Sequence, residues 1–385
     1  MIPYDVWAEI DLSAVAHNVR ALKGALSSAT RLMAVVKADG YGHGAVAVAR
    51  QVLAEGADCL AVARIGEALE LRYAGIQSQI LIFGHTPPGL TRKLLEHDLI
   101  QTVSSFTDAE AFSVRAAAAG ARLRVHINID TGMGRLGVLG VPPDGANGFS
   151  DAADEVAAIC GLQGLAAEGI YTHFATADSA DKSDARGQFA IFEQILSRLR
   201  RQGIVFSVRH AANSAAAMEM PETHLDMIRP GISIYGHYPS QETEGCGVSL
   251  TPAMTVRARI VHLKRVGPGF KVSYGWTAQT MENTLIATVP IGYADGFFRL
   301  LSSRGFMRVR GYRAQVIGRV CMDHTMLDVG HIPGVACGDA ALVFGRDADG
   351  DLPVESVAGT LDTINYEVLS RISSRIPRVY IKGGS

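Results

Sequence analysis

Short apolar runs alternate with longer stretches of helical periodicity between residues 30 and 236. The runs are rich in Val, Ile and Leu, which is typical of strands buried on both faces of a parallel sheet. The stretches between them, such as residues 65–74 and 187–202, carry apolar residues at helical spacing. Eight such alternations predict an α/β fold, a (β/α)8 barrel of the TIM type rather than a doubly wound sheet. The expected strands are residues 32–36, 59–62, 80–83, 100–103, 123–129, 169–172, 206–210 and 227–234.

The pattern changes near Gly236. Residues 237–250 are polar and loop-like, and after Pro252 the chain consists of strand-like runs separated by glycine turns. We therefore predict two domains, a barrel over residues 1–237 and a C-terminal all-β domain over residues 238–385. The expected strands of the second domain are residues 254–266, 285–290, 306–309, 314–326 and 340–344.

Composition narrows the classes of function. The chain has 385 residues, of which 48% are hydrophobic, and its net charge of -2 argues against nucleic acid or an anionic membrane as the main partner. The first residues lack the basic and apolar regions of a signal peptide, and no apolar run is long enough for a membrane span. The five cysteines are odd in number and lack metal-ligand spacing, which predicts reduced thiols in a cytoplasmic protein and no metal site.

Lys37 ends the first apolar run and is followed at once by a glycine-rich turn, Ala38-Asp39-Gly40-Tyr41-Gly42. A lysine is a poor choice for the end of a buried strand unless its amine has a task, because an unpaired buried charge is costly. One such task is a Schiff base with a carbonyl cofactor, in which desolvation also makes the amine nucleophilic. The alternative is a lysine whose amine simply extends from the strand end into water.

Polar residues follow the ends of several other expected strands. The active site of a barrel lies at the carboxyl ends of its strands, so these residues should meet at one mouth. The backbone N–H groups of Gly231 and Ile232, with the hydroxyl of Ser214, suit a phosphate. A Schiff-base lysine together with a phosphate site points to pyridoxal 5′-phosphate. The residues at the mouth would be Lys37, Asp130 to Arg135, His173, Asn213, Ser214 and Arg229.

These motifs, taken in order, resemble those of the bacterial alanine racemases, which are pyridoxal-phosphate enzymes of fold type III. The resemblance spans nearly the whole chain and implies a barrel followed by a β domain, paired head to tail as a homodimer with shared active sites. The matching pieces are residues 34–44, 130–137, 172–178, 229–236, 273–275, 293–296, 321–323 and 366–368.

The resemblance also implies roles for individual residues. Lys37 would hold the cofactor and act as one proton-transfer base, and Tyr274 of the partner subunit would be the other. Arg229 would bind the pyridine nitrogen, and His173 would contact Arg229 and Tyr274. The remaining implied contacts are Tyr41, Ser214, Gly231, Ile232 and Tyr366 around the phosphate, Arg135 and Met322 at the substrate carboxylate, and Tyr293, Arg299, Arg319 and Asp178 along the access channel.

Arg229 is the more diagnostic of these residues. Arginine offers only donors and stays protonated, so it leaves the pyridine nitrogen unprotonated and makes the ring a weaker electron sink. Taken singly, Tyr274 has the simpler interpretation of a turn tyrosine, His173 that of a core histidine and Arg229 that of a salt-bridge partner. Their joint occurrence at the expected strand ends favours the functional interpretation.

One position departs from the family. Its members commonly carry a carbamylated lysine, whose negative charge orients the arginine, where this chain has Asn128. An amide supplies no charge, so Arg135 needs another anion, of which bound chloride is one candidate.

The leading hypothesis is therefore a racemase that interconverts L- and D-alanine by a two-base mechanism and supplies D-alanine for peptidoglycan. Asn128 keeps open a broader or serine-directed racemase on the same scaffold. A basic amino-acid decarboxylase would place a carboxylate, not Arg229, at the pyridine nitrogen. A non-catalytic pyridoxal-phosphate carrier would lack the β domain that contains Tyr274 and Met322.

Overall fold

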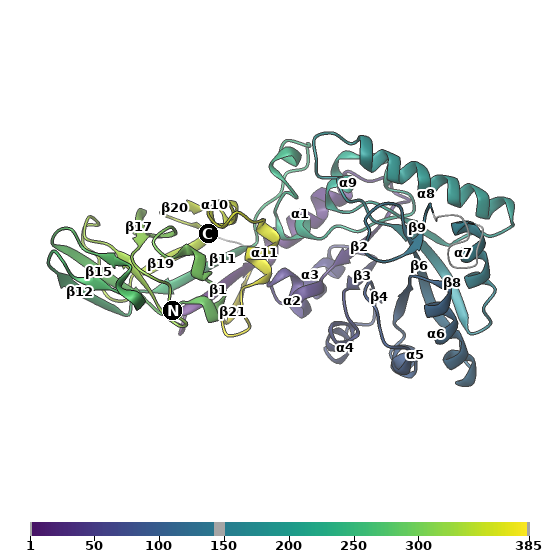
Figure 1. Ribbon diagram of the computed structural model, residues 1–385, viewed down its shortest axis with the longest axis horizontal. Helices are drawn as coiled ribbons and strands as arrows, with labels where there is room; N and C mark the ends of the chain where they lie inside the picture. Colours follow the sequence, from purple (N-terminus) through teal and green to yellow (C-terminus); the bar gives the residue numbers. More distant parts are fainter. Residues whose placement is uncertain (1, 142–150, 383–385) are drawn as a thin grey trace. The chain divides into compact units, whose positions relative to one another are not determined.

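The computed structural model describes residues 2–141 and 151–382. These residues form two compact units (Figure 1). The first unit contains residues 15–40, 45–141 and 151–251, and the second contains residues 2–14, 41–44 and 252–382.

The first unit is built around a parallel barrel. Its strands pair in the order β10-β2-β3-β4-β5-β6-β8-β9. The two ends of this series approach each other, because the N–H of Asp226 donates to the carbonyl of Arg209 (3.1 Å) and that of Arg229 to the carbonyl of Ala212 (2.9 Å). The barrel strands are β2 (Arg31–Val35), β3 (Cys59–Val62), β4 (Gln79–Ile82), β5 (Ile100–Val103), β6 (Leu123–Asp130), β8 (Leu165–Thr172), β9 (Val208–His210) and β10 (Met227–Ile228), and the short β7 (Val138–Leu139) pairs with β6.

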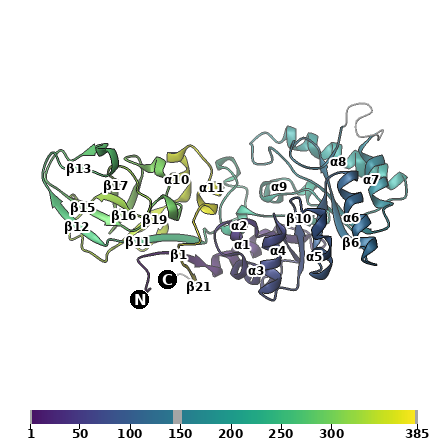
Figure 2. The same cartoon turned by 60° about the horizontal axis from the view of Figure 1, so that its bottom comes forward.

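Helices lie on the outer side of these strands (Figures 1 and 2). They are amphipathic: α6, for example, buries Phe112 against the sheet, and its first turn is capped by Ser105, whose hydroxyl accepts the N–H of Asp108 at 3.2 Å. The helices are α1 (Leu12–Gly24), α3 (Ala45–Ala54), α4 (Ile65–Tyr73), α5 (Thr91–Glu96), α6 (Phe106–Ala118), α7 (Ala152–Cys160), α8 (Ser183–Arg201) and α9 (Ser214–Glu219).

The predicted barrel is confirmed. Its last strand is much shorter than the sequence predicted. Residues 227–234 were predicted as a single strand, but β10 ends at Ile228 and a 3-10 helix, η4 (Ile232–Tyr235), follows. Pro230 lacks the N–H that a ladder needs, and Gly231 turns the chain away from the sheet. The segment therefore forms a loop at the barrel mouth.

The second unit is a mostly antiparallel sheet in the order β12-β15-β18-β17-β16-β19-β11-β1-β21, with β20 paired to β19 and a separate β13-β14 pair. Two helices, α10 (Val354–Leu361) and α11 (Asn365–Ser370), complete this unit. Its strands are β1 (Val6–Asp11), β11 (Met254–Arg259), β12 (His262–Val266), β13 (Lys271–Val272), β14 (Ala278–Gln279), β15 (Thr284–Val289), β16 (Phe306–Val309), β17 (Tyr312–Val316), β18 (Thr325–Asp328), β19 (Ala340–Asp347), β20 (Gly350–Leu352) and β21 (Arg378–Ile381).

Residues 6–11 were included in the expected barrel domain without a strand assignment, but they form a strand of this second sheet. Strand β1 pairs antiparallel with β11 and parallel with β21, so the chain begins in the β unit before it enters the barrel. The compact units also change at residues 251 and 252 rather than at residue 237. The expected strands 254–266 and 314–326 are each divided in two by a turn.

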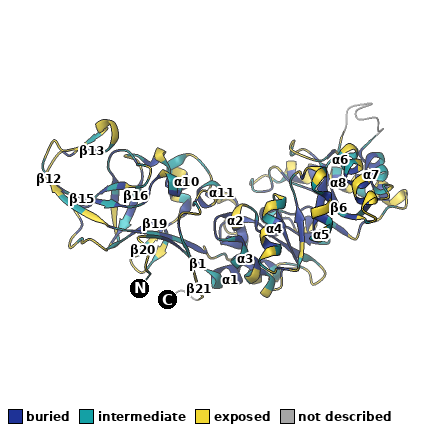
Figure 3. Cartoon of the chain, turned by 90° about the horizontal axis from the view of Figure 1, so that it is seen from below, coloured by how far each residue is buried: buried dark blue, intermediate teal, exposed yellow. Residues whose placement is uncertain are grey.

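Burial follows this architecture within each unit (Figure 3). The barrel strands are buried along most of their length, whereas β11 alternates buried and partly buried residues, as expected for a sheet with one covered face. No helix among the described residues is long and apolar enough to cross a lipid bilayer.

Candidate active site

Lys37 begins a strained turn at the carboxyl end of β2. The segment α2 (Lys37–Tyr41) has left-handed backbone angles, with φ of 53° at Ala38 and 52° at Asp39. Such angles cost about 1–2 kcal/mol for each non-glycine residue, so neighbouring contacts must hold them. Glu67 accepts the N–H of Ala38 (2.7 Å), and the carboxylate of Asp39 accepts the first N–H of α3 (2.8 Å). The turn thus fixes the direction in which Lys37 leaves the strand.

The pKa of the Lys37 amine is lowered from its usual value. The largest cause is desolvation of the partly buried amine, and the nearby positive charge of Arg135 acts in the same direction, whereas Glu67 opposes both. A larger fraction of the amine is therefore neutral near physiological pH, which is the form that can act as a nucleophile or a base.

Arg229 lies buried on the loop after β10. Among the described residues its hydrogen-bond acceptors are neutral, and its guanidinium packs on an aromatic ring. Its Nη1 donates to Nδ1 of His210 (3.0 Å), and its Nη2 donates to the carbonyls of Thr172 (2.8 Å) and Ala211 (3.0 Å). The guanidinium also lies over the ring of Tyr171, 5.1 Å from its centroid. Burial lowers the pKa of Arg229 to about 10, so it stays charged at neutral pH. Among the described residues none accepts a hydrogen bond from Nε, which leaves that donor for a ligand.

His173 joins Lys37 and Arg229 in one group. Its Nδ1 lies 3.2 Å from Nη2 of Arg229, and because arginine can only donate, Nδ1 must be the acceptor and Nε2 must carry the proton. Desolvation holds the pKa of His173 well below its ordinary value, and the charges of Arg229, Arg135 and Lys37 add to this effect. His173 is therefore neutral, with an N–H group on its far side.

Ser214, at the start of α9, organises the loop after β10. Its Oγ accepts the N–H of Gly231 (2.9 Å) and the hydroxyl of Ser233 (3.0 Å). The N–H of Gly231 is therefore already bonded, which differs from the expectation that it is free to bind a phosphate. Neither the hydroxyl hydrogen of Ser214 nor the N–H of Ile232 donates to a described residue, so both donors can still bind an anion.

The loop that carries Arg135 is held by side chains of β6. Asp130 accepts two loop N–H groups at 2.9 and 3.0 Å, and Nδ2 of Asn128 donates to the carbonyl of Leu136 at 2.5 Å. The Oδ1 of Asn128 is buried without a hydrogen-bond partner among the described residues. Arg135 itself is exposed and forms no ion pair with a described residue, so its charge is available to a carboxylate.

Tyr274 is displayed on the surface of the β unit. It begins the short helix η6 (Tyr274–Trp276), and 70% of its surface is exposed. The preceding Ser273 has φ of 64°, and its hydroxyl donates to the carbonyl of Arg319 at 2.6 Å. The turn is therefore anchored by its backbone while the phenol extends outward.

Tyr293 and Met322 occupy two turns that pack together in the same unit. The N–H of Tyr293 donates to the carbonyl of Cys321, and that of Ala294 to the carbonyl of Met322, both at 3.0 Å. Gly292 has no room for a Cβ, which would collide with the carbonyl oxygens of Cys321 and Met322. Met322 is 52% exposed and Tyr293 42%. The β unit thus gathers Tyr274, Arg319, Tyr293 and Met322.

Tyr41 and Tyr366 also lie together in the second unit. Their ring centroids are 6.2 Å apart, and Nε of Arg378 donates to the carbonyl of Gly42 at 3.0 Å, which ties this short segment to β21. Burial raises the pKa of the Tyr41 phenol, so it is a neutral hydrogen-bond donor at physiological pH. Two further residues were expected along the access channel. Arg299 begins η8 (Arg299–Leu301) in the β unit. Asp178 lies in the barrel unit, where its backbone carbonyl accepts the hydroxyl of Ser240 at 2.6 Å.

Comparison with known families accounts for both units. A family profile described as the N-terminal domain of alanine racemase matches residues 10–239, and one described as its C-terminal domain matches residues 253–380. The chain belongs to the alanine racemase family.

Individual relatives agree with this assignment over their full lengths. An alanine racemase of Desulfosudis oleivorans is 52% identical and covers 100% of this chain and 99% of its own. The solved structure of a Bacillus anthracis alanine racemase with bound L-Ala-P has a TM-score of 0.92 at 36% identity, covering 100% of this chain and 97% of that one. A Bartonella henselae alanine racemase with covalently bound pyridoxal phosphate has a TM-score of 0.86 at 26% identity, with 98% and 100% covered.

The chain is thus an alanine racemase, an isomerase that interconverts L- and D-alanine. The relationship inferred from the motifs is confirmed, and the serine-directed and carrier alternatives gain no support from these relatives. Two buried histidines behind this alanine racemase site were not anticipated, His210, which contacts Arg229, and His126, which contacts His210. A signal existed for His126, because His126, Asn128 and Asp130 alternate along one strand and so share its inward face.

Proposed function

We propose that this racemase uses pyridoxal 5′-phosphate held by the barrel mouth, with Lys37 and Tyr274 as its two proton-transfer groups. The observation that carries the proposal is Lys37, whose amine is partly buried, has a lowered pKa and is aimed by a strained turn. The nearby donors match the cofactor's two polar ends. Nε–H of Arg229 suits a pyridine nitrogen, and the Ser214 hydroxyl with the Ile232 N–H suits a phosphate.

When bound, pyridoxal phosphate supplies a conjugated ring that withdraws electrons from the Cα of an attached amino acid and so acidifies its hydrogen. The protein has to remove that proton from one face and deliver another to the opposite face. Lys37 does this at Nζ, where its lowered pKa favours the neutral form. Tyr274 of the partner subunit would do so at its phenol oxygen, and the 70% exposure of this side chain fits a group that acts on a second subunit.

Arg229 and His173 tune this site without moving the substrate proton. Arg229 has only donors, so it would hold a bound pyridine nitrogen as an unprotonated acceptor, and this would restrain transamination. His173 has its proton on Nε2, so it can donate to the phenol oxygen of Tyr274 of the partner subunit. Arg135 has a charge that is not paired with a described residue and binds the substrate carboxylate, with Met322 of the partner subunit beside it. Tyr41 and Tyr366 complete the phosphate contacts, and Tyr293 lines the access channel.

The proposal includes a homodimer and a biosynthetic role. A head-to-tail pair makes two equivalent sites from one interface, and the exposure of Tyr274 and Met322 fits residues that act on a second copy. All five cysteines are free, in keeping with a cytoplasmic enzyme that provides D-alanine for peptidoglycan.

The test starts from purified enzyme incubated with pyridoxal phosphate, reduced with borohydride and digested. The expected result is one reduced adduct on the peptide that contains Lys37, together with racemisation of alanine measured by chiral chromatography. Tyr274→Phe should keep the adduct and lose about 10²–10⁴-fold in kcat, the usual size of a general-base effect. An adduct on another lysine, or near-native turnover by Tyr274→Phe in both directions, refutes the assignment.

A further inference from the structure

Two buried histidines extend the contacts of Arg229 through the interior of the barrel. His210 ends β9 and is fully buried, and His126 lies in β6 with 3% of its surface exposed. Nδ1 of His210 is 3.0 Å from Nη1 of Arg229, and Nε2 of His210 is 2.8 Å from Nδ1 of His126. Three side chains from separate parts of the chain are therefore joined in one line of hydrogen bonds.

The chemistry of arginine determines where every proton in this line lies. Arg229 can only donate, so Nδ1 of His210 must accept and its proton must be on Nε2. That Nε2–H then donates to Nδ1 of His126, which leaves the proton of His126 on its own Nε2. One donor-only residue thus selects the same tautomer in two rings.

Both rings are also held neutral. Desolvation lowers the pKa of His126 to about 3, and the charges of Arg124, Arg31 and Arg229 add to the effect. The pKa of His210 is lowered well below its ordinary value by desolvation, then by Arg229, His126 and Arg31. The charges that lower the two pKa values are cationic, and Glu168, which lines the same cavity as His126, is paired with Arg124 at 2.9 Å. A second proton on either ring would also place two donors face to face.

The neighbouring elements are shaped to hold both rings in place. His126 pairs with Gly169 on β8, where a Cβ would lie 2.6 Å from three atoms of the imidazole. The ring of Tyr171 stacks on that of His210 at 4.8 Å and 11°, and the same tyrosine lies under the guanidinium of Arg229. Close packing of this kind leaves each ring one orientation.

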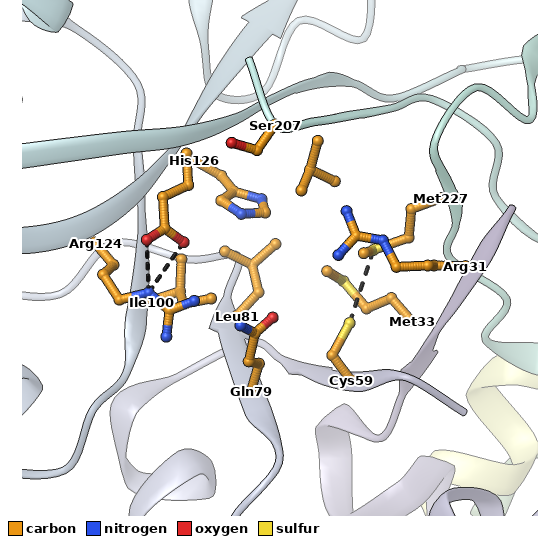
Figure 4. A pocket seen from close by; sticks show the side chains of 12 residues that line it. Arg31, Met33, Cys59, Gln79, Leu81, Ile100, Arg124, His126, Ser207 and Met227 are labelled. Carbon is orange, nitrogen blue, oxygen red and sulfur yellow. Dashed lines mark hydrogen bonds and ion pairs between the residues drawn. The ribbon is translucent and has the colours of Figure 1, made fainter. Parts of the chain in front are cut away.

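The line ends at a cavity at the amino ends of the barrel strands, opposite to the end that Lys37 follows. This cavity of about 340 Å³ is lined by His126 together with residues at the starts of several strands, including Arg31, Cys59 and Met227. Figure 4 shows the His126 imidazole among these side chains. The line of hydrogen bonds therefore runs from the amino ends of the barrel strands, at His126, to Arg229 at the barrel mouth.

We propose that His210 and His126 are positioning residues for Arg229: their fixed tautomers present one acceptor to Nη1 and so hold the guanidinium with Nε directed to the cofactor ring. The proposal rests on the proposed function, because it is Arg229 that would bind the pyridine nitrogen. His210 acts directly on Arg229, and His126 acts by holding His210. Neither histidine touches the substrate.

The tautomers can be measured without cofactor or substrate. Protein labelled with ¹⁵N-histidine and freed of pyridoxal phosphate should show both rings neutral, with the proton on Nε2, from pH 6 to pH 9. The signals are assigned with His126→Asn and His210→Asn. A proton on Nδ1 of either ring, or titration of either ring within this range, overturns the proposal. This outcome is independent of whether the wild-type enzyme binds the cofactor or racemises alanine, which tests the proposed function.

Paired substitutions then separate positioning from space filling. His210→Leu removes the acceptor, whereas Oδ1 of His210→Asn can take the place of Nδ1. We expect His210→Leu to weaken pyridoxal phosphate binding to the apoenzyme and to lower kcat, each by about 10–100-fold, the usual effect of losing a hydrogen bond to a charged group. The KM for alanine should change by less than about threefold, and His210→Asn should recover most of both losses. Equal defects in the two variants would show that the ring only fills space.

Gly169→Ala provides a second route in which both histidines remain. Its methyl group displaces the His126 ring, so the Nε2–H signal of His210 should shift as its hydrogen bond to His126 is lost, although its tautomer stays the same because Arg229 still donates to Nδ1. Pyridoxal phosphate binding should weaken in the direction of His210→Leu. Folding is checked by circular dichroism. A folded Gly169→Ala protein in which the histidine signals shift but the affinity for pyridoxal phosphate is unchanged would rule out a role for His126.

Discussion

At the scale of single residues, Lys37 and Arg229 of the barrel differ in how readily each loses its proton. Lys37 is partly desolvated beside Arg135, so its proton is easily lost. Arg229 is more deeply buried, yet two carbonyls and His210 accept its hydrogen bonds and keep it charged. One residue is thereby prepared to exchange a proton and the other to hold one in place.

The lowered pKa of Lys37 has a consequence for stability in the absence of cofactor. Below the folded-state pKa, the desolvated charge destabilises the fold. As pH rises from that pKa toward the unfolded value, the unfolded chain binds more protons, so stability increases with pH. Lys37→Met should therefore be more stable than wild type at pH 7, by about 0.5–2 kcal/mol. The difference should shrink as the pH approaches 10. Urea unfolding of both apoproteins at several pH values measures it, and a constant difference would contradict it.

Asn128, where a departure from the family was expected from the sequence, is placed by the structure to hold the loop of Arg135. Its Nδ2 holds the carbonyl of Leu136, the neighbour of Arg135. Asn128→Leu should loosen this loop and raise the KM for alanine up to about tenfold, with kcat changed by less than about threefold. Unaltered KM in a folded variant would show that the loop does not depend on this bond.

The charge next to Arg135 can be examined with the same assay. If an inorganic anion pairs with Arg135, the KM in chloride should be lower than in gluconate at equal ionic strength, because general screening does not distinguish the two salts. Asn128→Asp, which adds a fixed charge, should reduce that difference. Identical KM values in both salts exclude an anion site.

At the scale of elements, the sequence predicted best what depends on neighbours in the chain. The strand before Lys37 and the helix at residues 187–202 were recognised because their periodicity is local. Strand β1 was not placed, because its partner β11 lies far along the chain and no local pattern records such a pairing. The hydrogen bonds between Arg229, His210 and His126 were missed for a similar reason, since the two histidines become neighbours only when β6 and β9 lie on either side of β8.

The contact between two turns of the β unit yields a further prediction. In Gly292→Ala the added methyl would push away the carbonyls of Cys321 and Met322, which would displace both Tyr293 and Met322. We expect kcat/KM for alanine to fall about 10–100-fold, as for a displacement of the order of 1 Å at a reacting site. Gly187→Ala is the matched control, because that position is exposed in α8 with open space around it and should gain about 1 kcal/mol of stability. Equal kcat/KM in the two variants would contradict the prediction.

At the scale of the whole molecule, the proposed machinery is divided between the two units. Lys37, His173 and Arg229 belong to the barrel, whereas Tyr274 and Met322 belong to the β unit. The family profiles follow the same division, one to each unit. In a head-to-tail pair the barrel of one subunit would take its second base from the other, so each chain would contribute to two sites.

Complementation tests this division of labour directly. Lys37→Ala and Tyr274→Phe should each be nearly inactive as homodimers. A heterodimer of the two holds one site in which Lys37 and Tyr274 are both intact, so mixed subunits should recover about a quarter of wild-type activity if pairing is random. Tags of different charge allow heterodimers to be isolated, in which half of the wild-type activity is expected. Purified heterodimers that remain inactive would show that each site draws both residues from one chain, and the two-fold arrangement would have to be abandoned.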